Sequence, residues 1–212
     1  MPVAVPADVR VIYSDDALIV VDKPAGLLAV PGRGEERQDC VAARVQAQFA
    51  DARIVHRLDQ ATSGLMLLAR GATAQRALSA AFEMRRVGKR YVAVVAGLVA
   101  EDQGCIDLPL AADWPNRPRQ QVEPERGKAS LTRWRVLHRD AVQGTTRLEL
   151  EPVTGRSHQL RVHLLAIGHA IVGDALYAPT LAAPRLMLHA SALTIAHPFD
   201  ARALNFSSAA PF

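Results

Sequence analysis

The sequence predicts an α+β fold with a large mixed, mainly antiparallel β-sheet flanked by a few helices. Most of its apolar segments have the length of a strand, short turn-like stretches separate them, and few segments repeat apolar residues at the helical period. The chain has 212 residues, half of them hydrophobic, which suffices for one large domain or two small ones. No linker or internal repeat is visible, so we expect a single domain over residues 1–212.

The N-terminal part predicts a pair of strands followed by a helix. Residues 9–13 and 17–21 are apolar runs on either side of a short polar turn. Asp22-Lys23-Pro24-Ala25-Gly26 then ends the second strand, because Pro and Gly interrupt regular structure. Asp39 is placed to cap a helix over residues 41–49, where apolar residues recur every four positions.

The middle of the chain predicts a strand, a helix and another strand. Residues 65–69 form a continuous apolar run, which is typical of a strand that is buried on both faces. Thr73 can cap the following helix, and Gly88 is a suitable residue just beyond its last turn. Residues 89–95 predict the next strand, with Tyr91 near its start.

The C-terminal half predicts further strands and one helix. Short strands are expected over residues 105–110 and in the apolar segments of residues 184–195. Residues 131–137 and 146–150 alternate well enough to pair antiparallel, with Gly144 in the turn between them.

The last predicted helix runs from an N-cap at Ser157 to a stop at Gly168. Its buried stripe consists of apolar residues at helical spacing, Leu160, Leu164 and Ile167. Arg161 lies about 100° round the helix from Leu160, because each residue of an α-helix turns by that angle. This places Arg161 at the edge of the core.

Residues 111–121 form an irregular segment that is rich in Pro and Arg and contains Trp114. Loops of this length within compact domains are usually functional or disordered. Arginine beside an aromatic residue is compatible with contact to nucleic acid. A solvated connection explains the composition equally well, so both interpretations stay open.

The most polar stretch before a buried strand is the loop of residues 55–65, and Asp59 is its carboxylate. No other acidic residue occurs between Asp51 and Glu83. Asp59 and Thr62 can form an Asx-type turn, which is a purely structural explanation. The other explanation is a working acid, because loops held by a rigid scaffold often carry the chemistry of an enzyme.

Composition excludes several classes of protein. The net charge is +4, and of 25 basic residues only Lys23, Lys89 and Lys128 are lysines. Arginine suits phosphate and base contacts, although codon bias accounts for its abundance equally well. Two distant cysteines argue against a disulfide framework or a cysteine-rich zinc site. No apolar run reaches the ~18 residues of a membrane span, and no secretory signal begins the chain, so we expect a cytoplasmic protein.

Common catalytic motifs are also missing. No phosphate-binding glycine-rich loop with its lysine is present, and His158 and His163 lack the spacing of a zinc-binding helix. His56, Asp59 and Ser63 are the residue types of a hydrolase triad. They lie within one loop, whereas such triads are usually assembled from distant segments, so a hydrolase is a distant alternative.

Four ordered stretches resemble the RluA family of pseudouridine synthases. The family signature is similar to residues 56–65, HRLDQATSGL. Its other motifs resemble residues 22–27, residues 89–91 and the region of residues 155–174. Three further stretches resemble the branch of the family that modifies both large-subunit ribosomal RNA and the tRNA anticodon stem-loop; these are residues 30–33, 113–118 and 184–190.

The resemblance implies the pseudouridine synthase catalytic-domain fold, with its active site in a central cleft, and no N-terminal S4 RNA-binding domain. The implied reaction converts a uridine in RNA into its carbon-glycoside isomer. No electron is transferred and no atom is gained, so the resemblance implies no cofactor and no metal. The expected partner is RNA with the target base in a loop; we expect no membrane, no obligate protein partner and a monomer. A non-catalytic RNA-binding protein of the same fold is the main alternative.

The resemblance also assigns the catalytic residues. Asp59 acts as nucleophile or as base towards the ribose, with Arg161 as its ion-pair partner. Tyr91 abuts the flipped uracil, and Arg57 fills the gap that the base leaves. Without the resemblance, Arg161 is equally explained by a surface phosphate contact, Tyr91 by a half-buried strand aromatic and Arg57 by a salt bridge to Asp59.

The remaining predicted site residues fall into two groups. Further RNA contacts are expected from basic side chains in or beside the motifs, namely His56, Lys89, Arg90, Arg117, Arg119 and Arg156. Structural support of the site is expected from residues that shape the loop or the last helix, namely Thr62, Ser63, Gly64 and Leu160.

Overall fold

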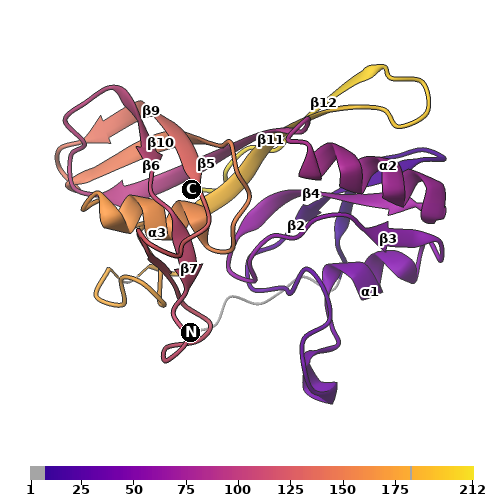
Figure 1. Cartoon of the computed structure of the whole chain (residues 1–212), viewed down its shortest axis with the longest axis horizontal. Coiled ribbons are helices and arrows are strands. Elements are labelled where there is room, and N and C mark those ends of the chain that lie inside the picture. The colour runs from indigo at the N-terminus through magenta and orange to yellow at the C-terminus, as the bar shows by residue number, and fades with distance from the viewer. Residues whose placement is uncertain (1–7, 182) are drawn as a thin grey trace. The chain divides into compact units, whose positions relative to one another are not determined.

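The computed structural model describes residues 8–181 and 183–212, and Figure 1 shows its helices and strands. The chain divides into two compact units. Unit 1 takes the described residues as far as Lys89 together with His189–Pro211, and unit 2 takes Arg90–Leu188 with Phe212. The prediction of one domain over residues 1–212 stays a prediction, and each unit is described by itself. Residues 1–7, on which the expected absence of a signal rests, lie outside the described residues.

The sheet of unit 1 is mixed and mainly antiparallel. Strand β4 (Ser63–Arg70) pairs parallel with β11 (Leu188–Ala196), and its remaining neighbours run antiparallel. The antiparallel neighbours of β4 are β2 (Leu18–Lys23) and β3 (Ala52–Ile54). Strand β1 (Arg10–Ser14) pairs antiparallel with β2, and β12 (Ala203–Ser207) pairs antiparallel with β11. Residues 63–69 of β4 are all buried, so the predicted buried strand is confirmed.

Two α-helices belong to unit 1. Helix α2 (Gly71–Glu83) packs on β4 through Ala74 and Leu78. It begins after Arg70 and ends before Gly88, which lies in β5, so both predicted ends of this helix are wrong. Arg85, with φ 57°, takes the left-handed conformation just after the helix.

Helix α1 (Val41–Gln46) is capped by Cys40, not by Asp39 as predicted. The Cys40 sulfur accepts the Ala43 N–H, while the Asp39 carboxylate accepts two hydrogen bonds from Arg44. A short 3-10 helix, η1 (Glu35–Arg37), precedes it.

Unit 2 contains an antiparallel sheet in the order β5-β10-β9-β6. Its strands are β5 (Gly88–Ala96), β6 (Gln103–Asp107), β9 (Leu131–Asp140) and β10 (Thr145–Pro152). The predicted pairing of β9 with β10 is confirmed, and Gly144, with φ 62°, lies in their turn. Strands β7 (Leu110–Ala112) and β8 (Gln120–Val122) form a separate hairpin.

Helix α3 (Gln159–Ala166) packs on β8, β9 and β10. His158, with φ 52°, precedes it in place of the predicted cap Ser157, and Gly168 follows the C-cap Ile167 as predicted. Leu164 is fully buried, whereas Ile167 is exposed, so the predicted stripe is too long by one residue.

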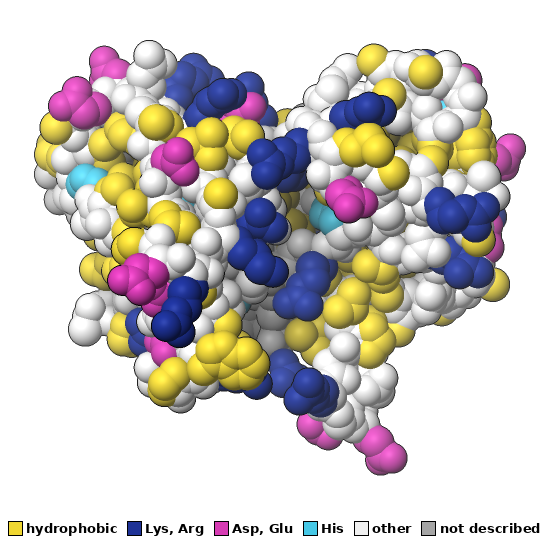
Figure 2. All heavy atoms as spheres, viewed as in Figure 1, with side chains coloured by type: hydrophobic (Ala, Val, Ile, Leu, Met, Phe, Trp, Pro, Cys, Tyr) yellow, Lys and Arg dark blue, Asp and Glu magenta, His cyan; other side chains and the backbone are white. Residues whose placement is uncertain are grey.

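The predicted α+β class is confirmed by this mixed, mainly antiparallel strand pairing and by the few helices. Figure 2 shows Lys and Arg side chains on the surface of both units, in keeping with the formal net charge of +4. Within the described part of the chain, no helix is long and apolar enough to cross a membrane.

Candidate active site

The loop that carries Asp59 is fastened to the end of β2 by a buried lysine. Lys23 has no exposed surface, and its Nζ donates to the carbonyl oxygens of Pro24 at 2.9 Å, Gln60 at 2.9 Å and Thr62 at 2.6 Å. A buried ammonium is tolerated only with such partners. These hydrogen bonds therefore hold together two stretches that the family resemblance singled out, residues 22–27 and 56–65.

A second connection joins the same two stretches. The Gly26 N–H donates to the Gln60 carbonyl at 2.8 Å, and the Gln60 side chain returns a hydrogen bond to the Gly26 carbonyl at 2.9 Å. Gly26, with φ 88°, has a conformation that side chains disfavour. The backbone that follows Asp59 is therefore held by atoms of residues 23–26.

The turn after Asp59 is made by the backbone rather than by the Asp59 carboxylate. The Thr62 N–H donates to the Asp59 carbonyl oxygen at 3.1 Å. Among the described residues, the buried Thr62 Oγ1 has no hydrogen-bond partner. The Asx-type turn that explained this loop structurally is thus not formed with Thr62, and the carboxylate is not used for it.

Ser63 and Gly64 fix the point at which the loop enters β4. Ser63 Oγ lies 2.8 Å from His189 Nδ1, in the parallel pairing of β4 with β11. Gly64 has φ 109°, and a Cβ there would lie 2.3 Å from the Ala190 carbonyl oxygen. Only glycine fits this approach. These contacts support the structural roles predicted for both residues.

His56 has a structural contact within unit 1. Its Nε2 accepts the Leu67 N–H at 2.8 Å, and its ring stacks on Phe82 at 4.4 Å. Burial lowers the pKa of His56 to about 3, and the charge of Lys89 adds to this. A neutral imidazole suits the acceptor role at Nε2. With Ser63 engaged by His189, the three residues of the hydrolase alternative do not form a triad.

The other basic residues predicted in unit 1 are Arg57 and Lys89. Arg57 is exposed, and no hydrogen bond or ion pair ties its guanidinium to Asp59 or to any other described residue. The salt-bridge explanation of Arg57 is therefore not supported. Lys89 is partly buried, which lowers its pKa, and the neighbouring charge of Arg85 lowers it further.

In unit 2, Tyr91 and Arg90 point to opposite faces of the sheet, because side chains alternate along a strand. Tyr91 pairs with Leu150, which is fully buried. That face also carries Thr132, whose Oγ1 lies 2.9 Å from His163 Nδ1 on α3. Tyr91 is therefore on the face that α3 covers.

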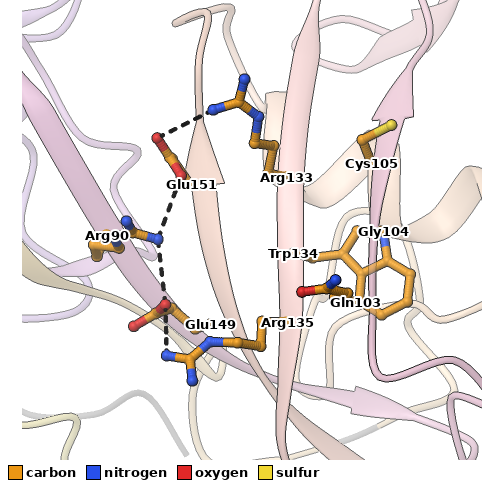
Figure 3. A pocket seen from close by; sticks show the side chains of 9 residues that line it. All are labelled: Arg90, Gln103, Gly104, Cys105, Arg133, Trp134, Arg135, Glu149 and Glu151. Atoms are coloured by element: carbon orange, nitrogen blue, oxygen red, sulfur yellow. Dashed lines mark hydrogen bonds and ion pairs between the residues drawn. The ribbon is translucent and has the colours of Figure 1, made fainter.

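Arg90 lies on the other face, beside a pocket of about 450 Å³ (Figure 3). Its guanidinium is 3.3 Å from both Glu149 and Glu151. Arg135 pairs with Glu149 at 3.0 Å, and Arg133 with Glu151 at 3.8 Å. The dashed lines of Figure 3 trace this ladder of alternating charges across β5, β10 and β9. The predicted RNA contact of Arg90 stays a prediction.

Arg161 is buried, with 6% of its surface exposed, so a surface phosphate contact does not account for it. Its Nε and Nη2 each donate to one oxygen of Asp174 at 2.7 Å. Asp174 Oδ1 also accepts the N–H groups of Leu176 and Tyr177, each at 3.1 Å. Two parallel charge-assisted bonds fix the plane of the guanidinium. The ion pair predicted between Arg161 and Asp59 stays a prediction.

Sequence reasoning assigned no role to Asp174, although it lies in the last stretch of the family resemblance. A buried arginine needs a carboxylate, and that requirement was the available signal. Tyr177 was also missed; its ring lies 4.9 Å from the Arg161 guanidinium carbon and 5.2 Å from that of Arg119. Its hydroxyl oxygen accepts the Gln120 N–H and lies 2.7 Å from His158 Nδ1.

The residues that flank Arg161 tie α3 to strand β9. Gln159, which is buried, donates to the Leu131 carbonyl and to Thr132 Oγ1, each at 3.0 Å. His163 Nε2 lies 3.0 Å from the Leu108 carbonyl, and burial lowers the pKa of this histidine. Leu160 is buried as predicted. The helix that carries Arg161 is therefore held by polar bonds as well as by packing.

The last predicted RNA contacts in unit 2 are Arg117 and Arg156, which are exposed, and Arg119, which is partly buried. Arg117 covers one face of the Trp114 ring, and Arg156 Nε donates to the Ala129 carbonyl at 3.3 Å. Apart from its contact with the Tyr177 ring, the Arg119 side chain has no partner in residues 8–181 and 183–212. In the same residues, no group of His, Cys, Asp and Glu could hold a metal ion.

Comparison with known proteins places this chain in a family. A family model described as RNA pseudouridylate synthase matches residues 17–166. The chain is 50% identical over 205 residues to the dual-specificity RNA pseudouridine synthase RluA of Yersinia pestis, covering 95% of this chain and 99% of that protein. Against RluA of Escherichia coli K12 the identity is 49%, covering 95% and 93%. These values confirm the expected resemblance to the RluA branch.

Solved structures agree. Human RNA pseudouridylate synthase domain containing 1 matches with a TM-score of 0.82 and 28% identity, covering 100% of this chain and 87% of that one. Human RNA pseudouridylate synthase domain containing 4 shares the fold, with a TM-score of 0.76, 23% identity and coverage of 95% and 88%. The chain therefore belongs to the RNA pseudouridylate synthase family, and its identification from sequence as a pseudouridine synthase, an isomerase, is confirmed.

Proposed function

We propose that this protein isomerises specific uridines to pseudouridine in large-subunit ribosomal RNA and in the tRNA anticodon stem-loop. The observation that carries the proposal is the fixed loop of Asp59, which Lys23 clamps through the carbonyls of Gln60 and Thr62. The double specificity is taken from the names of the RluA relatives, which match nearly the whole chain.

Asp59 is the proposed nucleophile or base. The reaction needs an ionised carboxylate in a site that excludes water, and burial by itself would raise the carboxyl pKa and neutralise it. A positive partner offsets that cost, and we assign this role to Arg161. Asp174 fixes the plane of this guanidinium through Nε and Nη2. Tyr91 is the proposed residue that abuts the flipped uracil.

Arg57 is the proposed residue that replaces the flipped base. A uridine stacked in RNA cannot be reached, so it must leave the stack at a cost of a few kcal/mol. An exposed guanidinium without an ion pair to Asp59 can enter the gap without losing a protein contact. Loop RNA is the expected target, since its bases are readily unstacked.

The remaining features follow from the same proposal. Asp59 belongs to unit 1 and Tyr91 and Arg161 to unit 2, so we propose that the two units act as one catalytic domain. Lys89, Arg90, Arg117, Arg119 and Arg156 are proposed phosphate contacts. We further propose a monomer that works in the cytoplasm, where ribosomal RNA and tRNA are modified.

The proposal is tested by tritium release from RNA that carries the label at carbon five of uracil. Wild-type protein releases tritium, and Asp59→Asn abolishes release while RNA binding stays within about tenfold, or roughly 1.4 kcal/mol. The matched control is Asp51→Asn, which removes an exposed carboxylate of unit 1 that pairs with Arg70. No release by the wild type with ribosomal or tRNA transcripts would favour a non-catalytic RNA-binding protein. Full activity of Asp59→Asn would refute the assignment of Asp59.

A further inference from the structure

The hairpin of β7 and β8 ends in a loop that presents Trp114 to solvent. The residue is 69% exposed although the Arg117 guanidinium carbon lies only 3.2 Å from its ring centroid. One face of the indole is thus covered by Arg117, and an exposure this high leaves the other face open. The other tryptophan, Trp134, packs over Gly104 in the sheet.

The loop is ordered by its own hydrogen bonds. The Asp113 N–H donates to the Arg119 carbonyl at 3.0 Å, and the Arg119 N–H to the Asn116 carbonyl at 3.0 Å. Asn116 Nδ2 lies 3.0 Å from both carboxylate oxygens of Asp113. The loop is therefore already ordered before a ligand stacks on Trp114, so binding loses little conformational entropy of the loop.

The arginines of this loop are not neutralised by ion pairs with described residues. Arg117 and Arg119 form no ion pair with any carboxylate in the described part of the chain, and the Asp113 carboxylate is occupied by Asn116. The ladder on the open face of the sheet differs, because each of its arginines pairs with a glutamate. An exposed indole that packs against Arg117, with Arg119 in the same loop, suits a ligand that carries both a flat ring and negative charge.

The same loop is joined to Arg161 through one side chain. The Tyr177 ring contacts both the Arg119 and the Arg161 guanidinium groups, and its hydroxyl oxygen accepts the Gln120 N–H at 2.7 Å. The loop is thus anchored, inside unit 2, at the arginine to which the catalytic role is assigned.

We propose that Trp114 is a stacking platform for an unpaired base of the substrate RNA, a base that flanks the target uridine, with Arg117 holding the indole in place. Arg119 supplies positive charge for the adjoining phosphate. This inference rests on the proposed function. Stacking has no preference for a particular base, because every base has a π-face. The platform therefore recognises that an unpaired base is present beside the uridine, and not which base it is.

Fluorescence tests the stacking directly. Trp134→Phe leaves Trp114 as the sole tryptophan, and an RNA stem-loop that the wild type modifies is titrated into it. A base stacked on the indole quenches its emission. Trp114→Phe, which retains only Trp134, is the matched control and shows no such quenching. Should Trp134→Phe not fold, the wild type is compared with Trp114→Phe instead.

Binding and kinetics give the size of the effect. Trp114→Ala weakens RNA binding about 5- to 150-fold, the range that stacking on an aromatic side chain supplies, whereas Trp114→Phe loses less. The loss falls on KM with kcat unchanged, because the stack is equal in ground and transition states. Phe199→Ala removes a similarly exposed aromatic of unit 1 and leaves both values unchanged.

An RNA series then identifies the stacked base. Each loop nucleotide beside the uridine is replaced in turn by an abasic one, and the effect of Trp114→Ala disappears at the position that stacks. The inference is overturned if Trp114 emission is not quenched, if Trp114→Ala binds within about twofold of wild type, or if no abasic position removes its effect. Absence of tritium release by the wild type would instead overturn the proposed function.

Discussion

Arginine–carboxylate pairs occur on both faces of the sheet of unit 2, and they differ in burial. On the face that α3 covers, the side chains of Arg161 and Asp174 are 7% and 1% exposed and share two hydrogen bonds of 2.7 Å. On the open face, Arg90, Arg133 and Arg135 are 49–61% exposed and reach their glutamates at 3.0–3.8 Å. The charges are the same on both faces, and only the surroundings change.

The difference shows how burial decides what a pair contributes. In water, an ion pair gains little, because solvent screens the charges and two long side chains lose freedom. Out of water, loss of either partner leaves an uncompensated charge, which is strongly unfavourable. The buried pair therefore positions Arg161. The exposed ladder keeps its strands in register but changes the free energy of unfolding only slightly.

The largest effect is expected from Asp174→Ala. It leaves the buried Arg161 guanidinium and the N–H groups of Leu176 and Tyr177 without their acceptor, so the free energy of unfolding falls by about 3–5 kcal/mol. Urea unfolding followed by circular dichroism measures the loss. Glu149→Ala is the control on the open face. A loss of less than about 1 kcal/mol would show that both pairs behave as surface pairs.

Asp174→Asn tests the positioning role separately from stability. The amide oxygen can still accept the backbone N–H groups, but one charge-assisted bond to Arg161 is lost. We expect kcat of tritium release to fall about 10- to 100-fold with KM little changed, because Arg161, the proposed partner of Asp59, is misplaced. An unchanged kcat in a folded Asp174→Asn protein contradicts this role for Asp174.

His56 extends the comparison to a partly buried neutral group. Burial lowers its folded-state pKa to about 3, so in acid the unfolded chain binds a proton that the folded chain does not. The contribution of His56 to the free energy of unfolding is therefore present in full above the unfolded-state pKa of about 6.5. The free energy of unfolding falls by about 1–2 kcal/mol between pH 6.5 and pH 5. His56→Gln retains an acceptor for the Leu67 N–H without titrating, and its unfolding free energy should vary less over this range. An equal pH dependence in both proteins would refute the assignment to His56.

The smallest effect is expected from Glu149→Gln. It removes one charge shared by Arg90 and Arg135, and the free energy of unfolding should change by less than about 1 kcal/mol, with the difference shrinking further at high salt. Thermal melts at low and high salt measure both. A larger, salt-independent loss would mean that the ladder is shielded from solvent.

Local pattern sufficed for the main elements and failed at their ends. The continuous apolar run of residues 65–69 could only be a buried strand, and the β9–β10 hairpin followed from alternation and Gly144. The caps were wrong at Asp39 and Ser157, because a cap depends on which side chain reaches the free N–H groups once the chain is folded. Asp39 was taken by Arg44 instead.

By itself, the sequence determined the family and the reaction, because four ordered motifs leave few alternatives. Only the tertiary structure decided what holds the motif residues: Lys23 on carbonyls 37 and 39 residues away, Ser63 against His189, and Arg161 against Asp174. The physical reason is that a buried polar group takes whichever partner the fold brings within hydrogen-bond distance. Such partners have no fixed spacing along the chain, so no local sequence pattern predicts them.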